Sequence, residues 1–127
     1  MNIQLNTSRK VELINITSQI SKMMKQHKIG EKETMLHLFV PHTTAAITIN
    51  ETADPAVCTD LEKALQYLVP AVSFEHMEGN SPAHFLASII GPHLTVPVFN
   101  NQLQLGTWQG ILFCEFDGPR RRELKVF

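Results

Sequence analysis

The sequence predicts a single α+β domain, in which a mainly antiparallel sheet of about seven strands carries two or three packed helices. Three observations lead to this fold class. The chain has 127 residues, which suits one hydrophobic core. Segments of alternating apolar and polar residues lie near both ends. Two helix starts that contain proline lie in the central part of the chain, between these alternating segments. We therefore expect one domain over residues 1–127.

The first elements are a short strand and a helix. Asn2–Thr7 alternates and is typical of a strand. Asn15 and Thr17 offer capping side chains, and Thr17–His27 is expected to be a helix that ends before Gly30. Its apolar residues fall at helical spacing and are best explained as core: Ile16, Ile20, Met23 and Met24.

Two strands are predicted next, over Glu33–Val40 and Thr43–Asn50, with Pro41 between them. In an extended chain, alternate residues share a face, so His42 is grouped with Thr44, Ala46, Thr48 and Asn50. The opposite face is apolar and belongs on the core. The face that includes His42 carries polar and small side chains, which favours a groove or a contact with another subunit.

Two helices are expected in the centre of the chain. Asp54-Pro55 combines a capping carboxylate with proline at the first helical position, and Pro70 ends this helix. Its apolar stripe comprises Val57, Leu61, Ala64, Leu65 and Leu68. A second helix starts at Asn80-Ser81-Pro82 and stops at Gly91. Its expected buried face comprises Phe85, Leu86, Ile89 and Ile90.

The last third of the chain is rich in β structure. The predicted strands are Leu94–Phe99, Gln102–Leu105, Trp108–Phe116 and Arg121–Val126. Asp117-Gly118-Pro119 marks a turn, because proline presets the backbone angle there. We expect the final strand to pair antiparallel with the strand before it.

Composition excludes several function classes. Apolar residues make up 43% and charged residues 18%, a globular balance. A net charge of -1 argues against a general nucleic-acid binder. The first residues lack the apolar core of a signal peptide, and no apolar run is long enough to cross a bilayer. Cys58 and Cys114 form no CxxC pair, which favours reduced thiols and a cytoplasmic location.

Three of the six histidines lie among polar neighbours: His42, His76 and His84. Histidine ionises near neutral pH, and its neutral ring is a common metal ligand. His76 and His84 flank a short loop that can fold them toward each other. We therefore expect a divalent metal ion, zinc or magnesium, held by all three, with His42 and His84 also in catalytic roles. The alternative is three ordinary hydrogen-bonded histidines.

Distance separates a second group of polar residues from the first. His42 and Asn50 are eight residues apart, so an unbroken strand at about 3.3 Å per residue separates them by ~26 Å. Glu51, together with Asp60 on the following helix, therefore forms a second candidate catalytic patch, unless a neighbouring subunit brings the two patches together. The alternative for Asn50-Glu51 is a strand end that leads into a capped helix.

Phosphate-binding groups are expected at two places. Arg120 follows a turn and can form bidentate hydrogen bonds with a phosphate, or it belongs to a solvated hairpin tip. Asn80 and Ser81 lie at a helix start, where free amides attract anions. Glu115 lies on a mostly apolar strand face, so its carboxylate needs a partner or a function.

At this level of detail the sequence resembles the YjbQ-like proteins, also called the secondary thiamine-phosphate synthase family. The resemblance spans essentially the whole chain and is carried by Pro41–Glu51, Glu75–His84, Leu105–Ile111 and Glu115–Arg120. The Gly-Thr-Trp-Gln and Asp-Gly-Pro-Arg strings within these segments are specific. The stretch between His76 and His84 is shorter and less acidic than in some relatives, with Glu78 as its only carboxylate.

The resemblance implies an α+β fold that assembles as a homotrimer, with polar residues near the subunit boundaries. It also implies a weak thiamine-phosphate synthase activity, which joins hydroxymethylpyrimidine pyrophosphate to thiazole phosphate and releases pyrophosphate. The expected partner is thus a phosphorylated small molecule. Two alternatives stay open: a metal-dependent hydrolase that uses the same histidines, and a non-catalytic trimer that binds a small molecule.

Overall fold

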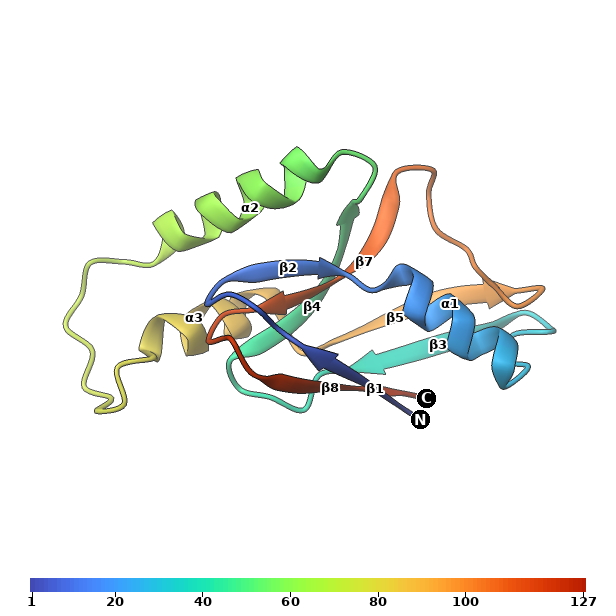
Figure 1. The fold of residues 1–127 in the computed structure, drawn as a ribbon, viewed down its shortest axis with the longest axis horizontal. Helices are drawn as coiled ribbons and strands as arrows, with labels where there is room; N and C mark the ends of the chain where they lie inside the picture. Colours follow the sequence, from blue (N-terminus) through green and yellow to red (C-terminus); the bar gives the residue numbers. More distant parts are fainter.

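The computed structural model describes residues 1–127 and consists of two antiparallel sheets and three helices (Figure 1). The five-stranded sheet has the order β1-β8-β3-β5-β6, and the three-stranded sheet has the order β2-β7-β4. The strands are β1 Asn2–Asn6, β2 Glu12–Asn15, β3 Thr34–Phe39, β4 Ala45–Glu51, β5 His93–Phe99, β6 Gln102–Leu103, β7 Gln109–Glu115 and β8 Arg121–Val126. The helices are α1 Thr17–Gln26, α2 Pro55–Leu68 and α3 Ser81–Ile90. The predicted α+β fold class is confirmed.

The main core lies where the two sheets and α1 meet. The helix α1 contributes Ile20, Met23 and Met24, as its helical spacing predicts. The three-stranded sheet contributes Ile47, Ile111 and Phe113, which point away from α3. Inward residues of β3, β5 and β8 complete this core: Leu36, Leu38, Val96, Val98, Leu124 and Val126.

A second, smaller core lies on the other face of the three-stranded sheet, where α3 packs. Ala46 of β4 is fully buried there, together with Leu112 and Cys114 of β7. Both faces of this sheet are therefore covered. We expected the His42 face of the strand predicted over Thr43–Asn50 to line a groove or contact another subunit. This expectation is wrong at Ala46, which is buried because its small side chain lets α3 approach the sheet. The strand also begins at Ala45, so His42 lies in the preceding turn.

Two expectations about the strands are wrong. The short strand β2 was not expected, and it pairs with β7. The final strand β8 does not pair with its predecessor β7 but with β1 and β3. The physical reason is that β2 and β4 already occupy both edges of β7, so the chain after Glu115 crosses to the other sheet. Gly118 allows this crossing, because a Cβ there would clash with the Arg9 carbonyl oxygen.

The apolar patterns of α2 and α3 are confirmed in part, because the second core includes or contacts five of the predicted residues: Leu61, Leu65, Phe85, Leu86 and Ile90. In α3 the buried residues are Ala83, Leu86 and Ala87, whereas Ile89 is half exposed. In α2 the only buried residue is Glu62, which binds Arg9 and the amide of Leu13, and Leu68 is half exposed. Figure 1 shows α2 extending along one side of the molecule. None of the three helices has the length and hydropathy needed to span a bilayer.

Candidate functional site

A polar pocket of about 340 Å³ opens where three segments meet: the turn before β4, the start of α3 and the start of β8. All of its lining residues except the first carry polar side chains: Pro41, His42, Thr43, Thr44, Glu78, Asn80, His84, Arg120 and Arg122. Four of the predicted site residues therefore meet in one place, namely His42, His84, Asn80 and Arg120.

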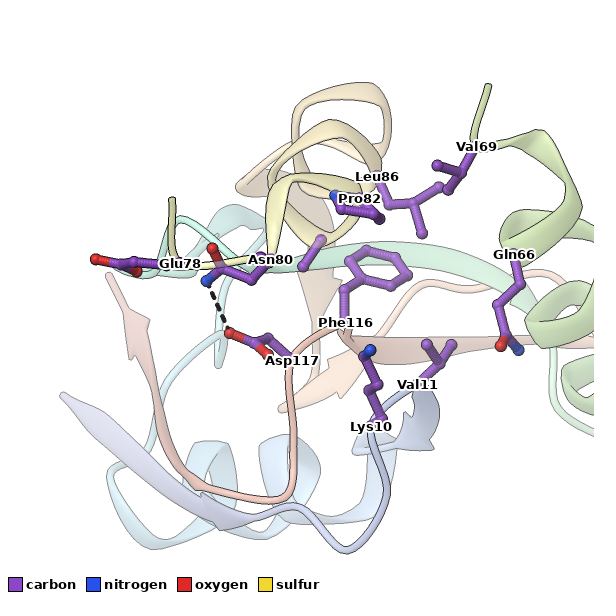
Figure 2. Close-up of a pocket in the computed structure, with 12 residues that line it drawn as sticks. Lys10, Val11, Gln66, Val69, Glu78, Asn80, Pro82, Leu86, Phe116 and Asp117 are labelled. Atoms are coloured by element: carbon purple, nitrogen blue, oxygen red, sulfur yellow. Dashed lines mark hydrogen bonds between the residues drawn. The ribbon is translucent and has the colours of Figure 1, made fainter. Parts of the chain in front are cut away.

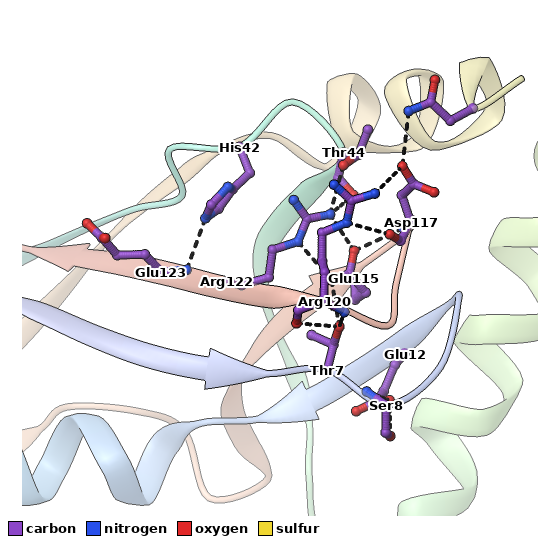
Figure 3. A network of polar contacts seen from close by, with 11 residues as sticks. Thr7, Ser8, Glu12, His42, Thr44, Glu115, Asp117, Arg120, Arg122 and Glu123 are labelled. Atoms are coloured by element: carbon purple, nitrogen blue, oxygen red, sulfur yellow. Dashed lines mark hydrogen bonds and ion pairs between the residues drawn. The ribbon is translucent and has the colours of Figure 1, made fainter. Parts of the chain in front are cut away.

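Behind this pocket lies a buried ion pair between Arg122 and Glu115 (Figure 3). The Arg122 side chain is 3% exposed and the Glu115 side chain is fully buried. Arg122 Nε donates to Glu115 Oε2 at 2.8 Å, and Arg122 Nη2 donates to Thr44 Oγ1 at 2.7 Å. The hydroxyl of Thr7 donates to Glu115 Oε2 at 2.9 Å. The predicted need of Glu115 for a partner is thus met by Arg122.

The Glu115 carboxylate stays ionised in this network. Burial would raise its pKa, but hydrogen bonds from Arg122, the amide of Asp117 and the hydroxyl of Thr7 outweigh that effect and lower the pKa. Arg122 also has hydrogen-bond donors that are not used within the chain. Its Nε and Nη2 groups make all of its hydrogen bonds, so the two N–H donors of Nη1 remain available to a ligand in the pocket.

The sequence places Arg122 in the cluster Arg120-Arg121-Arg122, which can meet a phosphate, but we did not predict that Arg122 is the buried member of this cluster. A signal for it was present, because Arg122, Leu124 and Val126 alternate on β8 and the last two are core residues. An arginine in phase with buried aliphatic residues points inward and requires an acidic partner.

His42 is held by a backbone contact from the neighbouring strand. The amide of Glu123 donates to His42 Nε2 at 3.0 Å, so the neutral ring carries its proton on Nδ1. Burial lowers the pKa of His42, and the positive charge of Arg122 lowers it further. At neutral pH His42 is therefore an uncharged hydrogen-bond donor through Nδ1.

We predict that long-range ¹H–¹⁵N NMR spectra at pH 7 show His42 as the neutral Nδ1–H tautomer. On acidification it should titrate below the usual histidine value of about 6.5. A protonated Nε2 at pH 7, or a midpoint for His42 above about 6.5, would contradict this assignment.

His76 and His84 do come together. Their ring centroids are 5.2 Å apart in an edge-to-face arrangement, with an interplanar angle of 88°. His84 lines the polar pocket and also a second hollow of about 320 Å³, and His42 lines both as well. The ring nitrogens of His84 make no hydrogen bond within the chain, so this ring is free to bind a ligand or move a proton.

The expected metal ligands His42, His76 and His84 do not form one cluster within a single chain. No three side chains of histidine, cysteine, aspartate or glutamate converge closely enough to hold an ion. His42 is also not suited to bind a metal ion, because its Nε2 already accepts a hydrogen bond and its Nδ1 carries the proton. The divalent ion stays a prediction, and we derive no step through it.

Asn80 and Arg120, which both line the polar pocket, are linked to each other through Asp117. Asn80 Nδ2 donates to Asp117 Oδ2 at 3.0 Å, and Arg120 Nη2 donates to the same oxygen at 2.9 Å. The Arg120 side chain is half exposed, so it retains donors for an anion. Asn80 Oδ1 is the single buried side-chain nitrogen or oxygen atom that lacks a partner.

Ser81 offers less to an anion than its position at a helix start suggests. The amides of Ala83 and His84 both donate to the Asn80 carbonyl oxygen, and Pro82 has no N–H. Only the amide of Ser81 is left at this helix start. Ser81 is not among the residues that line the polar pocket.

Glu51 and Asp60 lie apart from the polar pocket, as the distance argument predicts. Glu51 is at the far end of β4, opposite Gln109, and Asp60 is exposed on α2. Neither residue lines any of the three cavities of the molecule. Their predicted catalytic role stays a prediction, and it requires a neighbouring subunit.

Comparison with known proteins identifies the family. The family model described as "UPF0047 protein YjbQ-like" matches residues 1–127. The chain belongs to this family. A UPF0047 protein of Methanocaldococcus jannaschii is 46% identical over 124 residues, covering 97% of this chain and 88% of the relative. The UPF0047 protein YugU of Bacillus subtilis is 43% identical over 122 residues, covering 94% and 91%. The resemblance stated from the sequence is confirmed.

Solved structures of the YjbQ-like family share the fold. A crystal structure of a YjbQ/UPF0047 family protein from Clostridium acetobutylicum has a TM-score of 0.92 and 43% identity, and covers 100% of this chain and 98% of its own. A hypothetical protein from Aeropyrum pernix K1 has a TM-score of 0.91 and 33% identity, with coverage of 100% and 95%. The names of these proteins state no reaction.

Proposed function

We propose that the polar pocket binds the phosphate or diphosphate group of a small molecule. The observation that carries this proposal is the free Nη1 group of Arg122, a buried arginine whose remaining donors are fixed by Glu115 and Thr44. An arginine held in this way meets an anion without losing further side-chain freedom. Arg120 supplies a second cation on the pocket wall, and His42 supplies a neutral donor.

We further propose that the chain is a transferase of the thiamine-phosphate synthase type. In this reaction a bond forms between the pyrimidine methylene carbon and the thiazole nitrogen. The bond from that carbon to the diphosphate oxygen breaks, and the diphosphate leaves with the electron pair. Its developing charge is stabilised by the two arginines. His84, whose ring nitrogens are unpartnered, supplies a proton to the departing oxygen.

The test is an assay of purified protein with hydroxymethylpyrimidine pyrophosphate and thiazole phosphate, with and without magnesium. We expect thiamine phosphate and pyrophosphate in equal amounts, and inhibition by added pyrophosphate. Binding of pyrophosphate without turnover would replace the transferase by a non-catalytic binding protein. Absence of both binding and turnover would contradict the proposed site itself.

The same proposal includes a homotrimer in the cytoplasm. Support for assembly comes from large apolar side chains that a single chain leaves exposed, among them Tyr67 and Met77, which are 91% and 98% exposed. We predict that light scattering coupled to size-exclusion chromatography gives three times the 14.3 kDa mass of the chain. A mass of one chain at micromolar concentration would contradict this assembly.

A further inference from the structure

Asp117 places a negative charge next to the site that we propose for an anion. Its carboxylate pairs with Arg120, which lines the polar pocket, whereas Asp117 itself does not line that pocket. A carboxylate so near a phosphate repels it, and this repulsion alone would weaken binding. Stability does not explain the pair, because the Arg120 side chain is half exposed and exposed ion pairs contribute little to folding.

Asp117 holds one edge of the Arg120 guanidinium group. Arg120 Nε donates to the backbone carbonyl oxygen of Asp117 at 2.7 Å, and Arg120 Nη2 donates to Asp117 Oδ2 at 2.9 Å (Figure 3). The two N–H donors of Arg120 Nη1 stay unused within the chain. Glu115 holds the same edge of Arg122, through its Nε and Nη2 groups. In both arginines the free group is therefore Nη1.

The Asp117 carboxylate is itself held by the start of α3. Asn80 Nδ2 donates to Asp117 Oδ2 at 3.0 Å, and Figure 2 shows the two side chains pointing toward each other. The amide of Asp117 donates to Glu115 Oε1 at 2.9 Å, which ties this turn to the buried ion pair. The amide of Arg120 donates to the hydroxyl of Thr7 at 2.9 Å. Both the main chain and the guanidinium edge of Arg120 are thus fixed.

We infer that Asp117 is a positioning residue, which holds Arg120 so that its Nη1 group is presented to an anion in the polar pocket. This inference rests on the proposed function, because the polar pocket must bind a phosphate group. A half-exposed arginine without such contacts samples many rotamers, and an anion would have to order it on binding. Asp117 therefore raises the affinity through Arg120, although its own charge opposes the anion.

The test is calorimetric titration of the full-length protein with pyrophosphate. We expect Asp117→Ala to bind pyrophosphate on the order of tenfold more weakly, because the Arg120 side chain is released. Asp117→Asn keeps an oxygen acceptor for Arg120 and removes the charge, so it should bind at least as tightly as the unmodified protein. If the charge of Asp117 only repelled the anion, both variants would bind more tightly, and this result would overturn the inference.

Two further variants identify the route of the effect. In an Arg120→Ala background, adding Asp117→Ala should change the affinity by less than about twofold, because the group that Asp117 positions is already absent. A tenfold further loss there would overturn the inference. Glu12→Ala is the matched control, since Glu12 also pairs with an arginine three residues away, Arg9, and neither residue lines a cavity. Its affinity for pyrophosphate should equal that of the unmodified protein.

A measurement on the unmodified protein without ligand does not depend on any variant. The ¹H–¹⁵N heteronuclear NOE of arginine Nε reports how mobile each guanidinium group is. We expect Arg120 to be nearly as rigid as Arg122 and clearly more rigid than Arg121, an exposed residue whose side chain makes no hydrogen bond. Arg120 as mobile as Arg121 would overturn this inference alone. Absence of pyrophosphate binding by the unmodified protein would overturn the proposed function with it.

Discussion

Replacing Arg122 with methionine is expected to lower the free energy of unfolding by about 3–5 kcal/mol, the largest stability effect that the structure predicts. The variant keeps most of the side-chain volume but leaves the fully buried Glu115 carboxylate without its counter-charge. It also removes donors to Thr44, which holds the turn before β4. Urea denaturation followed by circular dichroism measures the loss.

Two variants control this experiment. Arg121→Met changes the neighbouring exposed residue of β8 and should cost less than about 0.5 kcal/mol. The double variant Arg122→Met with Glu115→Leu removes both charges and should recover much of the lost stability, because no buried charge is left unpaired. A stability of Arg122→Met equal to that of Arg121→Met would contradict the network.

Replacing His84 with alanine is expected to lower kcat of the proposed synthase reaction about 100-fold or more, which is the contribution of a positioned general acid. The His84 ring lines the polar pocket, and its nitrogens are free of partners within the chain. Stability should change little by comparison, because His84 is only partly buried and lies outside both hydrophobic cores. Steady-state kinetics with the two thiamine precursors gives kcat and KM separately.

The matched control is His27→Ala, an exposed histidine at the end of α1 that is remote from the pocket. Its kinetic constants should equal those of the unmodified protein. A His84→Ala enzyme with kcat within twofold of normal would remove His84 from the chemistry. A change confined to KM would leave it a binding residue only.

Local signals predicted local structure well. The helices α2 and α3 begin where proline and capping residues indicate, since these signals act within a few residues. The partner of β8 was not predictable in the same way. Strand pairing depends on which edges are already occupied, and β7 is flanked by β2, a strand of four residues with little pattern of its own.

In the candidate site, too, local features could be predicted from the sequence and long-range contacts could not. The sequence indicated that Glu115 needs a partner and that His42 and His84 have polar surroundings, because residue type and face are local properties. It did not indicate that the amide of Glu123, 81 residues away, fixes the tautomer of His42. The separation of the three predicted metal ligands likewise depends on long-range placement.

The binding of a phosphorylated group in the polar pocket is tested most directly by an NMR titration of the histidine side chains with pyrophosphate, without added metal. We expect saturable shifts of the His42 and His84 ring signals, with His27 and His37 unchanged, because only the first two rings line the pocket. Rings of His42 and His84 that do not respond at millimolar pyrophosphate would contradict it.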